Sequence, residues 1–412
     1  SFADPADALG LAHFLEHLLF LGSEKYPLPN ETERHLTMNG GESNAYTDDE
    51  QTNYHFDVLP AGFDEALDRF AQFFVAPTFE PSMTARELMA VDSEMQQNKQ
   101  SDSWRLHRVL QSQASAAHPW SRCTDGCLRT LRDDPKAKGY DVLAALRAFY
   151  DAHYTARAMK LVISGTQPLD TLESWARRSF SAIRARAALA PPASAPAAPP
   201  PAAVWPNLPE RLYVCPVKSL RFVELIFPMA PLDAHWREQP DDYLADLVGH
   251  ESPGSILYAL KKAGLATNLS AGAGFEHKEW SAFKITVSLS PRGLERVDSV
   301  VECVLCYVAL VMRADDATAQ RLWYEGALLC AMRFRFAGCS SFEPIDRVSN
   351  IAADMQTTRG HIPSPAHVLS FRRRMAHDGA LNKRFCAALR PDNMLLAIVA
   401  RRDEWPADAC LA

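Results

Sequence analysis

The sequence predicts an α+β protein made of two homologous units, each an antiparallel sheet with helices packed on it. Three observations lead to this prediction. The composition, 47% hydrophobic and 23% charged over 412 residues, is that of a globular chain with two to three domains. A Pro/Ala-rich tract from Ala187 to Ala203 separates two parts of similar length. The same order of elements then occurs in both parts.

The Pro/Ala tract reads AALAPPASAPAAPPPAA. Proline lacks the backbone N–H that helices and sheets need, so such a tract favours an extended linker. We therefore expect a first domain at residues 1–188, a linker at 189–207 and a second domain at 208–412.

The first part shows two helical segments, two strands and a further helix in order. An apolar helical segment ends in Gly-Ser, and a second helical stretch and a Gly-containing turn follow it. A short strand-like piece and an alternating strand come next, and a helix with Phe and Leu in phase comes last. Apart from the second helical stretch and the turn, these elements are Leu11–Ser23, Asn44–Thr47, Thr52–Leu59 and Gly62–Phe74.

The second part repeats this order with near-constant spacing. Its matching segments are Tyr243–Ser255, Asn268–Ala271, Ser281–Leu289 and Gly293–Val304. Corresponding landmarks are 224 to 232 residues apart, the extremes being Asn44 with Asn268 and Gly22 with Gly254. Such regularity indicates an internal repeat.

Charge and cysteine usage exclude several classes of function. A net charge of −7 without a long basic run argues against nucleic-acid partners and against binding to an anionic membrane. No apolar run approaches the roughly 18–20 residues that span a bilayer. Nine scattered cysteines suggest reduced thiols and a cytoplasmic location. Cys303 and Cys306 form a C-x-x-C in an apolar helical stretch, where we expect core thiols. Because the sequence begins with Ser1 and not with Met, the presence of an N-terminal targeting signal is left undecided.

The chemistry is concentrated in residues 13 to 17, His-Phe-Leu-Glu-His, an H-x-x-E-H motif inside the first helix. His13 and His17 lie about 40° apart on one helix face, one turn from each other, so both imidazoles can reach one ion. Glu16 faces the same region without ligating. A chance motif is the alternative, but two histidines and a glutamate are costly to bury unpaired on an apolar helix, which favours a metal site.

A third ligand is expected from the helical stretch Ser82–Ser115. Glu87 and Glu94 are two turns apart and share a face of this helix. An ordinary solvated acidic edge would give the same pattern, so spacing alone leaves the choice open.

Four segments of the sequence resemble the insulysin/pitrilysin family of zinc metallopeptidases, the inverzincins. They are GLAHFLEHLLFLGSEKYP (10–27), GGESNAYTDDEQTNYHFDV (40–58), ALDRFAQFFVAPTF (66–79) and ELMAVDSEMQQNKQSDSWRL (87–106). Weaker similarity continues at 247–255 and 389–400. The resemblance implies an insulysin/processing-peptidase-like fold and a zinc-dependent endopeptidase, of which this chain is the N-terminal half.

The resemblance also implies the zinc site. One Zn²⁺ per chain would be bound by His13, His17 and Glu94. Glu87 would orient the site by contacting a ligand. Glu16 would be the general base that takes a proton from the attacking water and passes it to the leaving amine.

Two substrate-binding regions are implied as well. Asn44 and Ala45 would lie on an edge strand that pairs with the substrate backbone beside the cleaved bond. Gly249, His250 and Glu251 would belong to an exosite that holds the N-terminus of the substrate. The alternatives are an ordinary turn leading into a strand for the first region and a structural helix end for the second.

The number of units leads to the remaining expectations. Full-length family members have four such units around a peptide chamber, and this sequence supplies two. We expect peptide substrates and a C-terminal half or second subunit that completes the chamber, with a homodimer also open. Family members also have a β-strand before the segment that matches residues 2–5 of this sequence. The alternative function is an inactive or partner-dependent peptide-binding scaffold subunit. In the second copy Ala245 and Gly249 replace the two histidines, so we expect a single metal site.

Overall fold

The computed structural model describes residues 1–185, 203–336, 344–357 and 374–406, which form two compact units. Unit 1 contains residues 1–99, 119–185 and 344–357, and unit 2 contains residues 100–118, 203–336 and 374–406. Most of the predicted linker at 189–207 lies outside the described residues. The predicted limits of the domains therefore stay predictions.

Unit 1 consists of helices around one two-stranded sheet. Its strands are β1 (Ser43–Thr47) and β2 (Thr52–Phe56). Its α-helices are α1 (Leu11–Leu19), α2 (Glu31–Met38), α3 (Phe63–Val75), α4 (Pro81–Asn98), α6 (Asp134–Ala137), α7 (Val142–His153), α8 (Leu169–Phe180) and α14 (Pro344–Thr357).

The core of unit 1 forms around α1, whose apolar side chains point to several sides. Leu11, Phe14, Leu15, Leu18 and Leu19 are almost fully buried. They pack with phenylalanines of α3 and with apolar side chains of α7 in one cluster. Burying each large apolar side chain stabilises the fold by about 1.5–3 kcal/mol. The helix that carries the H-x-x-E-H motif is therefore a central element of this core.

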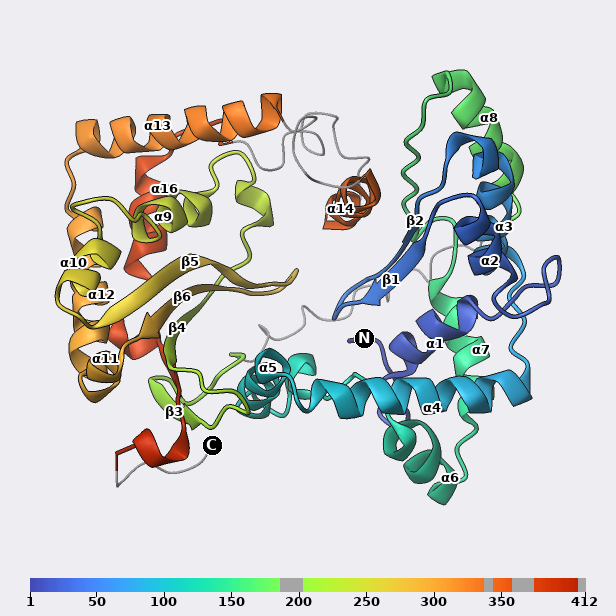
Figure 1. The fold of residues 1–412 in the computed structure, drawn as a ribbon, viewed down its shortest axis with the longest axis horizontal. Coiled ribbons are helices and arrows are strands. Elements are labelled where there is room, and N and C mark those ends of the chain that lie inside the picture. Colours follow the sequence, from blue (N-terminus) through green and yellow to red (C-terminus); the bar gives the residue numbers. More distant parts are fainter. Residues whose placement is uncertain (186–202, 337–343, 358–373, 407–412) are drawn as a thin grey trace, which may run out of the picture. The chain divides into compact units, whose positions relative to one another are not determined.

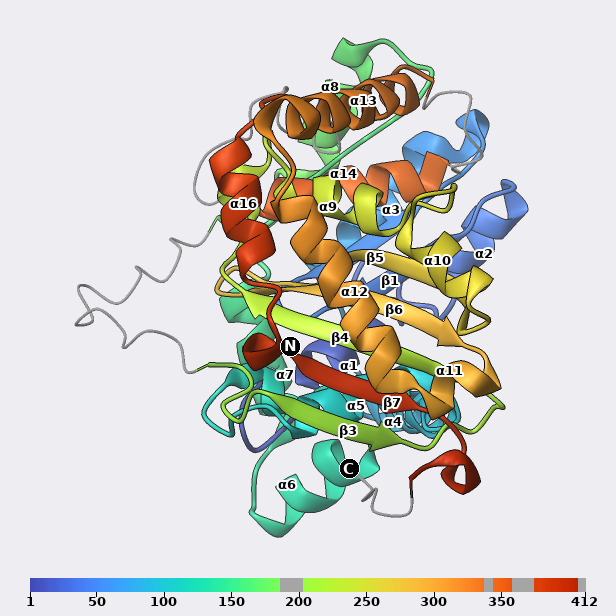
Figure 2. The same ribbon diagram turned by 90° about the vertical axis from the view of Figure 1, so that its left-hand side faces the viewer.

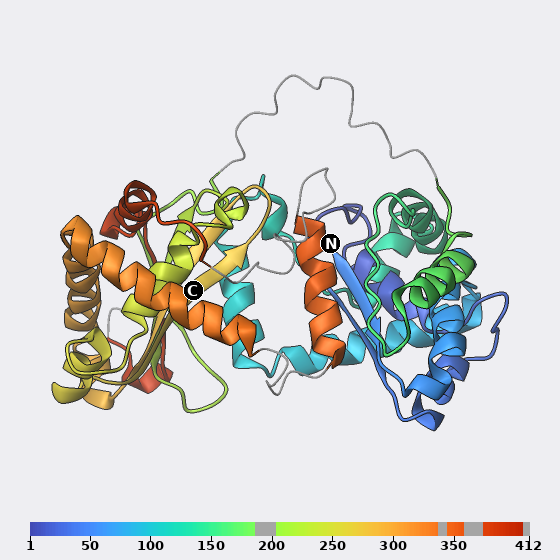
Figure 3. The ribbon, with the colours of Figure 1, turned by 90° about the horizontal axis from the view of Figure 1, so that it is seen from above.

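The hairpin β1–β2 lies beside α1 and α14. The two strands are antiparallel, with Ala45 opposite Tyr54 and Thr47 opposite Thr52. In Figure 1, α1 lies between this hairpin and α4, and it contacts both. Figure 3 shows α14, in orange-red, next to the blue hairpin. Asn53 of β2 donates its side-chain N–H to the backbone oxygen of Ser349 in α14 at 3.0 Å. These contacts hold the hairpin against the motif helix.

Unit 2 contains a five-stranded sheet and helices. Its strands are β3 (Glu210–Val214), β4 (Phe222–Met229), β5 (Ala266–Glu276), β6 (Ser281–Leu289) and β7 (Leu395–Val399). Its α-helices are α5 (Asp102–Ser112), α9 (Pro240–Val248), α10 (Ile256–Lys262), α11 (Pro291–Glu295), α12 (Val297–Met312), α13 (Asp316–Arg335) and α16 (Gly379–Ala387).

The sheet of unit 2 has the strand order β3-β7-β4-β6-β5. The β3–β7 pair is parallel, and the other neighbouring pairs are antiparallel. The central strands β4 and β7 are nearly continuous apolar runs, as strands covered on both faces require. Figure 2 shows the strands side by side in this order, with α12 and α16 crossing one face. The predicted α+β class with antiparallel strands is confirmed, and one parallel pair is added to it.

Several predicted elements agree closely with the structure, and others do not: the helix expected at 293–304, for example, is divided at Arg296 into α11 and α12. β6 spans the predicted residues Ser281–Leu289, and α3 is displaced by one residue from the predicted helix at 62–74. The helical stretch expected at 82–115 is two helices, α4 and α5, which belong to different units. The expectation of core thiols in the C-x-x-C is wrong, because Cys303 and Cys306 are exposed while the valines of α12 take the buried face. A helix with the length and apolar content needed to cross a membrane does not occur in the described ranges.

Candidate metal centre

The start of α1 is held in place by a buried carboxylate. Gly10 precedes the helix with a φ of 92°, in the left-handed region that favours glycine. Asp4 is 3% exposed and accepts hydrogen bonds from the backbone N–H groups of Gly10 at 2.7 Å and Ala12 at 3.0 Å. Desolvation raises the pKa of Asp4, while these backbone hydrogen bonds act against that rise. Asp4 thereby satisfies N–H groups that a helix start leaves free.

The two motif histidines point their Nε2 atoms at one place. His13 Nδ1 lies 2.6 Å from the backbone oxygen of Asp125, and a carbonyl only accepts, so Nδ1 carries the proton. His17 Nδ1 lies 2.9 Å from Glu87 Oε1, which orients that ring in the same way. The two Nε2 atoms are 3.2 Å apart. With both Nδ1 atoms donating, two Nε2 lone pairs face each other, an arrangement that calls for a cation between them.

Glu94 of α4 supplies an oxygen to the same place. Its Oε2 lies 3.4 Å from His17 Nε2 and 3.7 Å from His13 Nε2. Tetrahedral zinc with bonds of about 2.0–2.1 Å requires neighbouring donor atoms about 3.3–3.4 Å apart. The three separations of 3.2, 3.4 and 3.7 Å therefore fit a zinc ion with three protein ligands. The Glu94 side chain is 45% exposed, which leaves room for a fourth ligand from solvent.

The histidines and the carboxylates beside them shift one another's pKa values. Desolvation lowers the pKa of His17, but hydrogen bonds to Glu87 and Glu94 outweigh it and raise the pKa to about 9. The hydrogen bond from His17 lowers the pKa of Glu94. Without a metal ion, the carboxylates of Glu87 and Glu94 favour the protonated form of His17, which then carries the positive charge at this site.

Glu16 lies beside the histidines in a more enclosed position. Its side chain is 7% exposed, and its Oε2 accepts a hydrogen bond from Thr47 Oγ1 at 2.5 Å. Desolvation raises its pKa, although the bond from Thr47 acts in the opposite direction. His13, Glu16 and His17 offer ligand atoms within 4.8 Å of one another, the one such group found among the described residues. Glu94 Oε2 is also close to both Nε2 atoms.

The structure places the predicted substrate residues in two regions. Asn44 and Ala45 lie on β1. This strand ends at Thr47, the residue that donates a hydrogen bond to Glu16. In the described ranges β1 pairs with β2 on one edge, and no strand pairs with its other edge. Gly249 is the C-cap of α9 in unit 2, and His250 and Glu251 follow it as exposed residues.

Sequence reasoning missed the residues that orient the motif. Asp4, Thr47 and the Asp125 carbonyl carry no motif of their own. The one local signal is Gly126, which has a φ of 81° and whose backbone packs against Gly10. This close approach of two glycines brings the Asp125 carbonyl to His13.

Two parts of this chain match protein families, and most of its length is similar to individual known proteins. Residues 1–125 match the family described as Insulinase (Peptidase family M16), and residues 141–322 match the Peptidase M16 inactive domain. Insulin-degrading enzyme-like 1, peroxisomal, from Arabidopsis thaliana is 38% identical over 356 residues, which are 86% of this chain and 36% of that protein. Insulin-degrading enzyme from Drosophila melanogaster is 37% identical over 361 residues, 86% of this chain and 35% of that protein.

The structural comparison agrees with these matches. The crystal structure of pitrilysin superimposes with a TM-score of 0.86 at 27% identity, covering 98% of this chain and 41% of pitrilysin. The chain thus spans between a third and about two fifths of the length of these relatives. The matches to both M16 models, to insulin-degrading enzymes and to pitrilysin show that the chain belongs to peptidase family M16, the insulinase family.

Proposed function

We propose that this chain is the N-terminal half of a zinc-dependent endopeptidase that hydrolyses peptides. The observation that carries the proposal is the arrangement of three donor atoms, His13 Nε2, His17 Nε2 and Glu94 Oε2, at separations suited to zinc. Membership in family M16 supports it, as does the name Putative zinc protease mug138 of a 39% identical relative from Schizosaccharomyces pombe.

In this proposal each residue of the centre has one task. His13, His17 and Glu94 hold one zinc ion per chain, and Glu87 and the Asp125 carbonyl orient the two imidazoles. Zinc, when bound, lowers the pKa of water and polarises a carbonyl group.

Glu16 is the proposed general base. Thr47 holds its Oε2, so Oε1 is left to accept the proton of the attacking water and to pass it to the nitrogen of the leaving amine. A pKa raised by burial suits both transfers, since the carboxyl group must take the proton and then give it up.

The peptide is proposed to bind along β1. The edge of β1 that pairs with no described strand offers backbone groups to an extended chain, which gives affinity with little selection for side chains. The Ala45 N–H donates to Asn44 Oδ1 at 2.8 Å, so a peptide oxygen would replace that side-chain acceptor. Asn44 and Ala45 then lie beside the cleaved bond. Gly249, His250 and Glu251 are proposed to hold the substrate N-terminus, because the C-terminal end of α9 and the Glu251 carboxylate both attract an ammonium group.

Metal content tests this function directly. Purified and dialysed protein is expected to contain one zinc per chain by elemental analysis, and His13→Ala and Glu94→Gln are expected to lose it. Glu87→Gln keeps an acceptor oxygen for His17 Nδ1 and removes only the negative charge, so it is the matched comparison and should weaken zinc binding by about 10-fold without abolishing it. Folded wild-type protein that binds no added zinc would disprove the proposal.

A second candidate function is a peptide-binding subunit that needs a partner half to cleave. The short coverage of the relatives favours it, since the chain matches only 35–36% of the two insulin-degrading enzymes compared above. The partner would be a C-terminal half, a separate subunit or a second copy of this chain. If this function holds, the zinc-loaded chain leaves an internally quenched peptide intact until a C-terminal M16 half is added. Turnover by the isolated chain would exclude it.

A further inference from the structure

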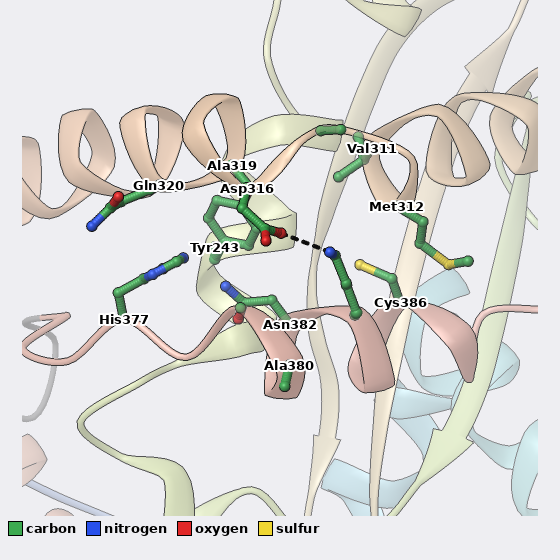
Figure 4. A pocket seen from close by; sticks show the side chains of 13 residues that line it. Tyr243, Val311, Met312, Asp316, Ala319, Gln320, His377, Ala380, Asn382 and Cys386 are labelled. Atoms are coloured by element: carbon green, nitrogen blue, oxygen red, sulfur yellow. Dashed lines mark hydrogen bonds and ion pairs between the residues drawn. The ribbon is translucent and has the colours of Figure 1, made fainter.

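A pocket in unit 2 lies apart from the residues assigned to the proposed function. It has a volume of about 440 Å³ and is formed between the end of α12, the start of α13, α9 and α16. Figure 4 shows the side chains that line it, with His377 and Asn382 below the start of α13. The volume falls within the range of small-molecule sites, about 300–1,000 Å³.

Most of the lining is apolar, and charge is confined to one ion pair. Val311, Met312 and Ala319 contribute aliphatic or thioether groups, and the largely buried Tyr243 contributes a ring. Asp316 and Lys383 form an ion pair at 2.8 Å, marked in Figure 4, and both side chains are largely exposed. The charges of this pair balance each other, so the pocket suits a neutral molecule with an apolar body.

The carboxamide of Asn382 is the distinctive group of this pocket. Asn382 is 6% exposed, yet neither its Nδ2 nor its Oδ1 has a hydrogen-bond partner among the described residues. His377, another lining residue, has a buried Nε2 that also has no partner within the described ranges. A buried polar group without a partner costs about 1–3 kcal/mol, so native proteins rarely keep such groups together without a use.

The unpartnered atoms define the complementary ligand. Asn382 presents a donor and an acceptor side by side, and an amide edge with adjacent N–H and C=O groups satisfies both at once. His377 Nε2 can accept or donate a third bond according to its tautomer. We propose that this pocket binds a small neutral molecule that joins an amide edge, paired with Asn382, to a flat apolar body lying against Tyr243 and Met312. This inference does not depend on the zinc site.

Two probes test this site on the full chain. 2-Quinolone carries the edge in a lactam, and 2-naphthamide carries it in an open carboxamide, so together they distinguish two sources of the same chemistry. Binding of at least one probe is expected by isothermal titration calorimetry. N-methyl-2-quinolone, which keeps the shape but loses the donor, is expected to bind at least about 10-fold more weakly than 2-quinolone if the lactam is preferred. For 2-naphthamide the matched control is the N,N-dimethyl amide.

Two variants locate the binding. Asn382→Leu keeps the size of the side chain without its polar atoms and is expected to weaken the better probe by about 10-fold or more. Asn268→Leu makes the same change at an exposed amide of β5 that does not line the pocket, so it is the matched control and should leave the affinity within about 2-fold. Far-ultraviolet circular dichroism and a thermal melt check that both variants fold. No binding of either probe at 1 mM, equal affinity for methylated and parent probes, or unchanged affinity in folded Asn382→Leu would each overturn the inference.

Discussion

Glu16→Gln is expected to lower peptide hydrolysis by about 10²–10⁴-fold while the zinc content stays at one per chain. The amide keeps the shape of the side chain and can still pair with Thr47, but it cannot take a proton from water. Zinc is expected to be retained because the proposed ligand oxygen is that of Glu94, whose Oε2 lies near both Nε2 atoms. The measurement is turnover of an internally quenched peptide by the active form, either the chain alone or the chain joined to a C-terminal half.

Thr47→Val gives a graded companion to this variant. It removes the hydroxyl that holds Glu16 Oε2 and leaves the carboxylate in place. Hydrolysis is expected to fall by about 10-fold, because one hydrogen bond to a carboxylate, of about 1.5 kcal/mol, no longer orients the base. Glu16→Gln with wild-type turnover would remove Glu16 from the role of base. A loss of zinc in the same variant would instead make Glu16 a ligand.

Gly10→Ala is expected to destabilise unit 1 by about 3 kcal/mol or more. Gly10 has a φ of 92°, and an added Cβ would lie closer to the Cα and N atoms of Gly126 than any non-bonded contact allows. The two backbones would have to separate, and the Asp125 carbonyl that orients His13 would move with Gly126. Zinc affinity should therefore fall by about 10–100-fold as well.

Gly139→Ala is the matched control for Gly10→Ala. Gly139 has a positive φ of 68°, but an added Cβ there meets nothing within 4 Å. Only the backbone conformation is penalised, so a loss of about 1–2 kcal/mol is expected, with unchanged zinc affinity. Urea unfolding and competition with a chelator measure the two quantities. Equal losses of stability in the two variants would show that the contact between Gly10 and Gly126 has no special weight.

Elements with strong periodicity could be predicted from the sequence almost to the residue. β6 alternates apolar and polar side chains from Phe283 to Leu289, and α3 repeats its phenylalanines at helical spacing. Breaks in continuous helical patterns were harder to predict. The stretch expected at 82–115 ends one helix at Asn98 and begins another at Asp102, because Ser101 takes an extended conformation that composition did not reveal.

Exposure and strand order could not be predicted from local patterns. Cys303 and Cys306 lie in an apolar run, yet the structure buries Val300, Val304 and Val308 on the opposite side of α12. The run at 395–399 predicts a buried strand, but not that β7 lies between β3 and β4 and pairs in parallel with β3. The exposure of the cysteines and the position of β7 both depend on which other elements pack against α12 and β7 in the folded chain.

The motif helix, the facing positions of His13 and His17, and the candidate carboxylates on α4 could be inferred from the residues alone, since they follow from the helical repeat within a few residues. How these groups meet depends on the folded chain. His13 is oriented by a carbonyl 112 residues away, and His17 by Glu87, 70 residues away. Helical periodicity is local, whereas hydrogen bonds across such distances form only after the core of unit 1 has brought α1, α4 and the loop at Asp125 together.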